Sequence, residues 1–270
     1  MTRAIGIDFI SFMGLPPVQS VALAAQLGCK HISIALAPMP GNPPRYPQWS
    51  LREDAVLRRD LIAAQRDYDV TISLGEGYLI LPGMDIRGTA ADMALMCELG
   101  IPIANIVAID PEWSRSIDQL AAFAEMAEAN GLQATLEMMP GMLIGTLDKA
   151  VAAIKEVGKP NLRLLLDSMH VFRSGATAED VAKLDPALVG YVQLCDVPLV
   201  SEYASYGEEA RFERLVPGDG ELPLAAFISA LPPSHMLGLE IPMRAKAQAG
   251  ITPLEALAPA VTVTRALLAA

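Results

Sequence analysis

The sequence predicts a single (β/α)8 barrel over residues 1–270. Short apolar runs alternate with longer amphipathic runs along the whole chain, and eight of the short runs have the length of a buried strand. Eight units in 270 residues leave about 34 residues for each, above the roughly 30 that a strand–helix–strand unit needs. Barrels of this class usually have about 250 residues, and we find no linker-like stretch that would divide the chain.

The sixth of the eight predicted strands is the clearest. Residues 162–166 are nearly unbroken apolar sequence that ends abruptly on Asp167, and His170 follows three residues later. A carboxylate and an imidazole therefore stand just past a buried strand, at the edge of the sheet where parallel α/β proteins place their chemistry. The strands are expected at residues 4–9, 31–36, 70–74, 103–109, 133–137, 162–167, 189–195 and 236–241.

Amphipathic segments between the strands predict helices. Residues 51–68 carry apolar side chains among Arg and Asp, and residues 116–130 are followed by Gly131, a usual helix stop. Thr146 is expected to open the helix after the fifth strand. Pro253, after Thr252, suits the first position of the last helix.

Two connections are too long to be simple turns. Residues 37–50 hold five prolines and Trp49, and residues 198–222 hold Tyr206 and Arg214. Both should lie at the carboxyl ends of the strands, where long ordered loops often form lids or binding walls. The alternative is a solvent-exposed loop without a function, and this alternative explains residues 37–50 equally well. Trp49 and Tyr206 are candidate pocket walls, although packing is the commoner role for such aromatics.

Each of the last four predicted strands carries, at or near its end, a side chain that can bind a metal through oxygen. Buried carboxylates are costly unless they are paired, hydrogen-bonded or bound to a cation, and three on neighbouring strands would repel one another. Because few Lys or Arg residues stand at these strand ends, a divalent cation is the simpler counter-charge. Three carboxylates and one amide suit one Mn²⁺, Mg²⁺ or Co²⁺ ion, and zinc is less favoured with so little imidazole. The four residues are Glu137, Asp167, Gln193 and Glu240.

With these residues in place, the chain resembles the sugar phosphate isomerase/epimerase superfamily, the xylose isomerase-like TIM barrels. The resemblance covers nearly the whole chain and is closest to hydroxypyruvate isomerase-like members, which have Gln at the third metal position where many others have His. The loop over residues 199–213 is longer than in those members. The motifs that carry the resemblance are the Glu137 strand, Asp167-x-x-His170, Gln193-x-x-Asp196-x-Pro198, the turn Pro217-Gly-Asp-Gly-Glu221 and Glu240-x-Pro242.

The resemblance implies a metal-dependent isomerase or epimerase acting on a small sugar or hydroxy-keto compound through an enediolate. Glu137, Asp167, Gln193 and Glu240 match the metal ligands of the family. Glu137 and Glu240 would also move the proton as general base and acid, while the metal acts as a Lewis acid. His170 matches a substrate-contacting histidine.

Three further residues are candidate substrate contacts. Arg214 is favoured over Arg173, Arg211 and Arg244 for pairing with a substrate carboxylate or hydroxyl, because a surface ion pair worth only ~0–1 kcal/mol explains the others as well. Asp196 lies in its motif beside Gln193. Glu76, at the end of the third strand, is expected either to face the pocket or to form a buried hydrogen bond.

Composition narrows the partners and the compartment. The formal net charge of −11 argues against a nucleic-acid or anionic-membrane surface, so any anionic substrate must meet local cations. No apolar run approaches the roughly 18 residues of a membrane helix, and the N-terminal stretch resembles a first strand more than a signal peptide. The three cysteines show no paired spacing, which suits a reducing cytoplasm. A homo-oligomer is suggested only by the resemblance and the apolar fraction.

Other functions remain open at this point. A dehydratase of a cyclic polyol ketone or a dehydroshikimate-like substrate would use the same parts, and its product would reveal it. An endonuclease IV-like nuclease is disfavoured, because its zinc cluster needs many histidines and this chain has three. A non-catalytic ligand-binding barrel is the third reading, against which the four intact metal positions argue.

Overall fold

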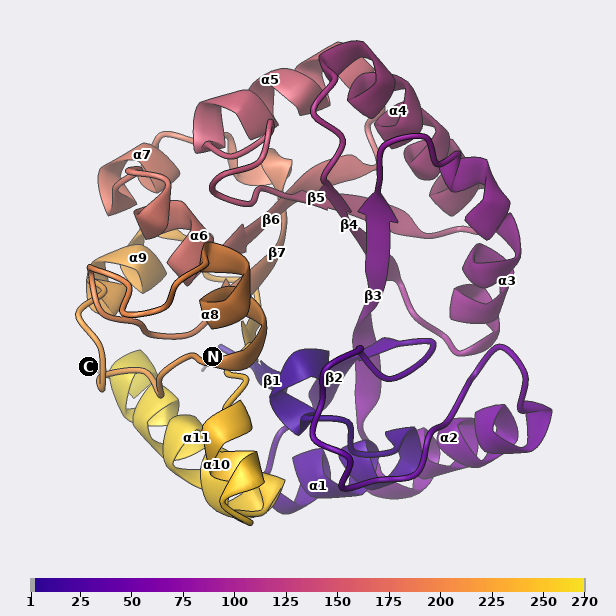
Figure 1. Ribbon diagram of the computed structural model, residues 1–270, viewed down its shortest axis with the longest axis vertical. Coiled ribbons are helices and arrows are strands. Elements are labelled where there is room, and N and C mark those ends of the chain that lie inside the picture. The colour runs from indigo at the N-terminus through magenta and orange to yellow at the C-terminus, as the bar shows by residue number, and fades with distance from the viewer. Residues whose placement is uncertain (1–2, 270) are drawn as a thin grey trace.

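Eight parallel strands close into a barrel in the order of the sequence, as predicted. The structure is a computed structural model that describes residues 3–269. Each strand pairs with its neighbours along the chain, and β1 also pairs with β8, which closes the sheet (Figure 1). The strands are β1 (Ile5–Ile7), β2 (His31–Ala35), β3 (Thr71–Ile80), β4 (Ile103–Ala108), β5 (Gln133–Glu137), β6 (Leu162–Asp167), β7 (Val189–Leu194) and β8 (Leu237–Leu239).

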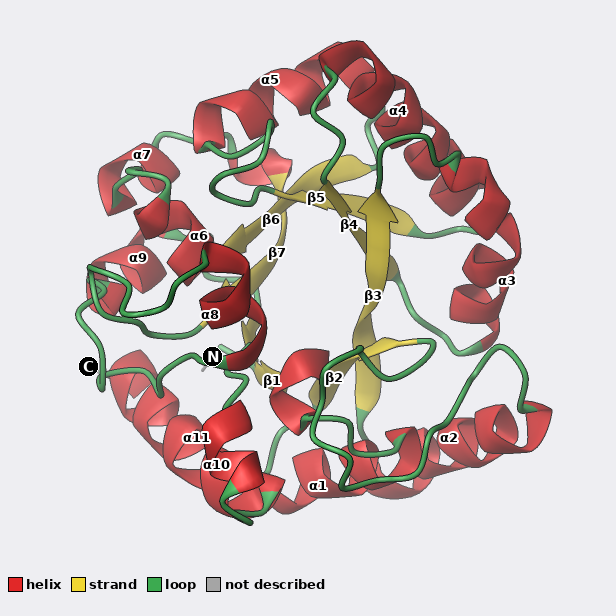
Figure 2. Cartoon of the chain, in the orientation of Figure 1, coloured by secondary structure: helices red, strands yellow, loops and turns green. Residues whose placement is uncertain are grey.

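Helices surround the barrel on its outer side (Figure 2). Within residues 3–269, no helix has the length and the apolar character needed to cross a membrane. The helices are α1 (Pro17–Gln26), α2 (Ala55–Tyr68), α3 (Ala90–Glu98), α4 (Trp113–Ala129), α5 (Leu147–Val157), α6 (Ser168–Arg173), α7 (Ala178–Ala182), α8 (Tyr206–Phe212), α9 (Leu224–Ala230), α10 (Arg244–Gln248) and α11 (Pro253–Ala269).

Side-chain caps explain where the predicted helices begin. α2 starts later than predicted, because the Asp54 carboxylate accepts the backbone N–H groups of Val56 and Leu57 in the first turn of the helix, both at 2.9 Å. α4 starts earlier than predicted, because Glu112 caps it in the same way. Thr146 caps α5 and Pro253 opens α11, as the sequence predicts.

Most strands end within one to three residues of their predicted bounds, and the changes in β3 and β8 bear on the site. β3 continues to Ile80 through a register shift between Gly75 and Tyr78, so Glu76 lies within the strand and not at its end. Gly77 has a φ of 96°, a left-handed conformation that glycine adopts without strain. β8 is shorter than predicted, and Glu240 follows it directly.

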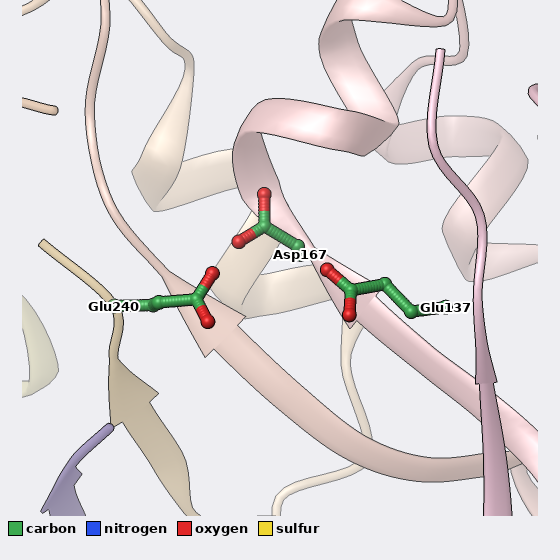
Figure 3. Close-up of side chains that lie close together, drawn as sticks. All are labelled: Glu137, Asp167 and Glu240. Atoms are coloured by element: carbon green, nitrogen blue, oxygen red, sulfur yellow. The ribbon is translucent and has the colours of Figure 1, made fainter. Parts of the chain in front are cut away.

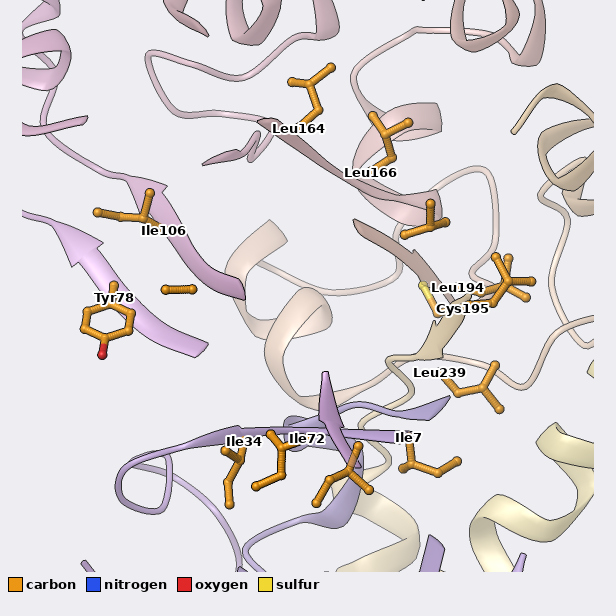
Figure 4. Packing of buried hydrophobic residues seen from close by; sticks show 14 of the residues in the cluster. Ile7, Ile34, Ile72, Tyr78, Ile106, Leu164, Leu166, Leu194, Cys195 and Leu239 are labelled. Carbon is orange, nitrogen blue, oxygen red and sulfur yellow. The ribbon is translucent and has the colours of Figure 1, made fainter. Parts of the chain in front are cut away.

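The main hydrophobic core lies between the sheet and the helices. Outward-facing side chains of the strands pack there, among them Ile7, Ile34, Ile106 and Leu239 (Figure 4). A second, smaller cluster joins Leu74, Leu165 and Tyr191, which come from β3, β6 and β7. Because β3 is not adjacent to β6 or β7 in the sheet, these side chains meet inside the barrel. The barrel interior is therefore filled below the carboxyl ends of the strands, as in other small barrels.

Candidate functional site

Three buried carboxylates converge at the carboxyl ends of the strands. Glu137 is the last residue of β5, Asp167 is the last of β6, and Glu240 follows β8. One oxygen of each lies within 4.8 Å of the others, and all three residues are buried. Figure 3 shows Glu137 and Glu240 extending toward each other from opposite sides, with Asp167 between them. The structure thus brings together the three carboxylates that the sequence singled out.

Glu137 is held in place by two neighbours. Asn105 of β4 donates a hydrogen bond from Nδ2 to Oε2 of Glu137 at 2.7 Å. His170 Nε2 lies 3.1 Å from the other oxygen, Oε1, and Tyr206 of α8 hydrogen-bonds the opposite ring nitrogen of His170. The ring of His170 is therefore oriented from both sides, so it fixes the direction of the Glu137 carboxylate.

Arg214 supplies a counter-charge that the sequence analysis did not expect at the strand ends. Its guanidinium is buried and lies 2.6 Å from Asp167 Oδ2 and 2.9 Å from Glu240 Oε2. Its Nε donates to the carbonyl of Ala210 at 2.7 Å. Arg214 lines the pocket, but its charge is shared by two of the candidate metal ligands. The sequence analysis found few cations at the strand ends and so did not expect an arginine to neutralise the carboxylates. This expectation is wrong, because Arg214, which is far from any strand end in the sequence, extends its side chain to Asp167 and Glu240.

Gln193 completes the predicted quartet from β7. Its Nε2 donates to Glu240 Oε1 at 2.9 Å, while its Oε1 is buried and has no hydrogen-bond partner among residues 3–269. An orphaned buried carbonyl oxygen beside three carboxylates is a set of hard oxygen donors, which is what Mn²⁺ and Mg²⁺ bind. Asp167 and Glu240 each keep a second oxygen that Arg214 does not contact. The residues present therefore fit a divalent cation.

Burial and Arg214 act in opposite directions on these carboxyls. Burial favours the neutral form of Asp167, but Arg214 and His170 outweigh it and lower the pKa of this carboxyl. At Glu240, burial outweighs Arg214, and the nearby Glu76 and Glu137 add to it, so the pKa is raised well above its usual range. Of these two carboxyls, Asp167 is therefore the more firmly ionised, and Glu240 is the one that further positive charge would stabilise more as a carboxylate.

A second pair of acids lies beside the cluster. Ser33 of β2 donates to Glu76, which lines the pocket, so Glu76 combines the two roles expected of it. Burial and the nearby Asp8 raise the pKa of Glu76 to about 8. Asp8, which follows β1, was missed by the sequence analysis; it accepts a hydrogen bond from Tyr191 at 3.0 Å, and burial raises its pKa to about 7. A carboxylate directly after an apolar strand was the signal that could have identified it.

An Asp8→Asn variant is expected to have a flatter dependence of stability on pH. Since the pKa of Asp8 is about 7 in the folded protein and 3.8 ordinarily, the folded state holds this proton more tightly than the unfolded chain. The free energy of unfolding therefore falls as pH rises from about 4 to about 7, by about 2–4 kcal/mol from this group. Urea unfolding at pH 5 and pH 8 measures this fall in the free energy of unfolding. An equal fall in wild type and variant would contradict the raised pKa of Asp8.

Asp196 lies apart from the cluster and does not line the pocket. Its carboxylate accepts backbone N–H groups of Val197, Gly218 and Leu222 at 2.8–3.0 Å. It therefore holds the turn that contains Gly218 against the end of β7. The expectation that Asp196 contacts substrate does not agree with this arrangement, because these bonds turn its oxygens toward backbone.

The carboxylates open into a cavity of about 430 Å³. Residues 37–40 of the proline-rich connection line one wall, and Ala210, Arg211 and Arg214 of the connection after β7 line another. Trp49 packs edge-on against Phe9 and is not among the lining residues. Tyr206 is not among the lining residues either, and its hydroxyl hydrogen-bonds the ring of His170, which is. Further lining residues include Ile10, Leu36, Leu79, Val107 and Met139.

Comparisons with known proteins agree with this geometry. A protein-family model described as a xylose isomerase-like TIM barrel matches residues 21–261. A 3-dehydroshikimate dehydratase of Pseudomonas aeruginosa is 28% identical over 185 residues, which cover 67% of this chain and 25% of that protein. An inosose isomerase of Bacillus subtilis is 28% identical over 118 residues, which cover 43% of this chain and 41% of that protein. The matches thus span less than half the length of either relative.

A solved structure extends the match to the whole fold. The IolI protein with a bound zinc atom superposes with a TM-score of 0.80 and 19% sequence identity, covering 100% of this chain and 98% of that chain. At this identity the likeness concerns the fold alone. The named relatives are isomerases and a dehydratase, which supports an enzyme in the present case.

Proposed function

Because the chain belongs to the xylose isomerase-like TIM barrel family, we propose that it is a divalent-metal-dependent isomerase or epimerase of a small sugar or hydroxy-keto compound. One observation carries the proposal: Glu137, Asp167 and Glu240 converge within 4.8 Å. Two of the three, Glu137 and Glu240, also line the cavity, beside the orphaned oxygen of Gln193. A relative with a bound zinc atom supports a metal in this fold, although the identity of the ion is a separate question.

Glu137, Asp167, Gln193 and Glu240 would hold the ion. A divalent cation there supplies Lewis-acid polarisation of a carbonyl group, which acidifies the neighbouring C–H. Glu137 and Glu240 extend toward each other from opposite sides, and both line the cavity, so one would remove a proton from carbon and the other would return it. His170 and Asn105 keep the Glu137 carboxylate in one orientation, and Asn105 donates a hydrogen bond that stabilises its charge. Because the barrel interior is filled, water would reach the site only through the mouth of the cavity.

The test combines metal content with proton exchange at carbon. Protein purified without chelator is expected to contain about one divalent ion per chain and, in D₂O, to exchange the proton next to the carbonyl of an accepted ketose, hydroxy-keto acid or cyclic polyol ketone. Proton NMR follows the exchange, and dialysis against a chelator should abolish it until Mn²⁺ is restored. If no ion binds even after Mn²⁺ is added, the proposal fails and a non-catalytic ligand-binding barrel becomes the better description.

A dehydratase is the second candidate, because the match to the Pseudomonas enzyme covers more of this chain than the matches to the isomerases. Removal of a proton next to a carbonyl followed by loss of a β-hydroxyl uses the same residues. The products separate the two: a dehydratase releases water and leaves a conjugated product with a new ultraviolet absorbance, whereas an isomerase or epimerase conserves the mass of its substrate.

A further inference from the structure

Within the described residues, one of the arginines that line the cavity forms no ion pair with a carboxylate. Three arginines line it: Arg52, Arg211 and Arg214. Arg214 is shared by Asp167 and Glu240. Arg52 forms a two-pronged pair with Asp92, at 2.8 Å and 2.7 Å.

Arg211 differs from the other two. Its Nε donates to Gly207 of its own helix at 3.1 Å, and within residues 3–269 no carboxylate lies within ion-pair distance of its guanidinium.

The acids nearest to Arg211 in sequence have other partners. Glu213 accepts a hydrogen bond from the backbone N–H of Ala245 at 3.0 Å and lies 3.8 Å from Arg244. Glu208 pairs with Arg244 at 2.7 Å, and Glu209 pairs with Arg173 at 3.0 Å. Arg211 instead lies with its guanidinium carbon 5.1 Å from the centre of the Phe212 ring, on the exposed side of α8. In a chain with a net charge of −11, a cation without an acidic partner beside a cavity is available to a ligand.

The walls near this arginine are largely apolar. The proline-rich connection contributes Pro38, Met39 and Pro40. The end of β3 contributes Leu79, and the loop after β5 contributes Met139. An open-chain polyol would leave most of its hydroxyls facing these side chains without hydrogen-bond partners, which is costly. A ring with an apolar face would fit them better.

On the basis of the proposed function, we propose that Arg211 binds a carboxylate of the substrate, and that the substrate is a small cyclic hydroxy-keto acid. The keto and hydroxyl oxygens would lie at Glu137 and Glu240, the ring against the apolar wall, and the carboxylate at the rim. A planar guanidinium matches a carboxylate with two parallel hydrogen bonds. One guanidinium neutralises the single charge of a carboxylate, whereas a phosphate dianion would keep a second charge near the partly negative C-terminal end of α8.

The test measures binding of two matched probes, shikimate and its methyl ester, which share the ring and hydroxyls and differ in the anion. Calorimetric titration of the Mn²⁺-loaded protein is expected to show a 10- to 100-fold preference for the acid, the range for hydrogen bonds to charged groups. Arg211→Gln should remove the preference and leave the affinity for the ester within about twofold. Arg244→Gln is the matched control, because Arg244 also lies over the Phe212 ring, at 4.3 Å, but pairs with Glu208 and does not line the cavity.

Several outcomes would overturn the assignment: equal binding of acid and ester by the wild type, no binding of either, a preference that survives Arg211→Gln, or an equal loss in Arg244→Gln. The proposed reaction and the proposed carboxylate site can each fail without the other. If uncharged ketoses alone exchange a carbon-bound proton and Arg211→Gln leaves their KM unchanged, the metal-dependent reaction stands and the carboxylate site is wrong. If Arg211 gives the preference but no carbon proton exchanges with any ketone, the ligand class stands and the reaction is wrong.

Discussion

A Glu240→Gln variant is expected to lose its divalent ion and to exchange substrate protons at least about 1,000-fold more slowly than the wild type. The amide keeps the size of the side chain but removes one of three carboxylates from the cluster and one of the two groups placed to carry the proton. The amide also removes the cost of burying a charge here and the repulsion from nearby carboxylates, which together raise the pKa of Glu240, so the variant is expected to be folded and at least as stable without metal. Elemental analysis and proton exchange in D₂O measure the two effects.

Asp110→Asn provides the matched control for Glu240→Gln. Asp110 is equally buried, but it pairs with Arg115 at 2.7 Å near the start of α4, away from the three carboxylates. This control should keep its metal content and its exchange rate. Full metal occupancy together with wild-type exchange in Glu240→Gln would contradict the assignment of Glu240 as a ligand and as a proton carrier.

An Arg214→Met variant is expected to be destabilised by about 3–5 kcal/mol in the presence of chelator. Methionine preserves much of the length of the side chain but leaves Asp167 and Glu240 buried without their shared cation. A divalent ion bound to the same carboxylates would replace part of that charge. The gain in stability on adding Mn²⁺ should therefore be larger in the variant than in the wild type, and urea unfolding with chelator and with Mn²⁺ measures both gains.

The control for Arg214→Met removes a different arginine from a buried acid. Arg115→Met leaves Asp110 unpaired, so it should also lower stability, but Mn²⁺ should not restore what is lost. If the stabilisation by Mn²⁺ is the same in Arg214→Met as in the wild type, then Arg214 and the ion do not share ligands. The arginine would in that case be a structural counter-charge alone.

The electrostatics of the site depend on which cation neutralises the carboxylates. The sequence analysis inferred a metal because it found few cations at the strand ends, and the structure places Arg214 between two of the carboxylates. Three ionised carboxylates and one guanidinium would still leave the cluster negative, and burial together with the nearby Asp8 raises the pKa of Glu76 beside it. A divalent ion would complete the balance of charge that Arg214 begins.

Local sequence determined the barrel and the position of its acids. A buried strand needs an apolar run, and the run must end where the chain leaves the sheet, so a carboxylate that follows such a run marks the carboxyl edge without any knowledge of the other strands. Glu137, Asp167 and Glu240 were predicted in this way. Asp8 obeys the same rule and was overlooked, whereas Asn105 lies within β4 and carries no comparable signal.

Tertiary structure decided the partners of these acids. Whether Arg214 reaches Asp167, or Tyr206 reaches His170, depends on how the connection after β7 folds back over the barrel, and no spacing in the sequence encodes that path. The same folding turned Asp196 toward backbone N–H groups and left Arg211 beside the cavity without an acidic partner. Strand ends follow from short-range hydrophobic pattern, but the pairing of charges depends on contacts between residues far apart in the chain, because each charge selects its partner by proximity and burial in the folded state.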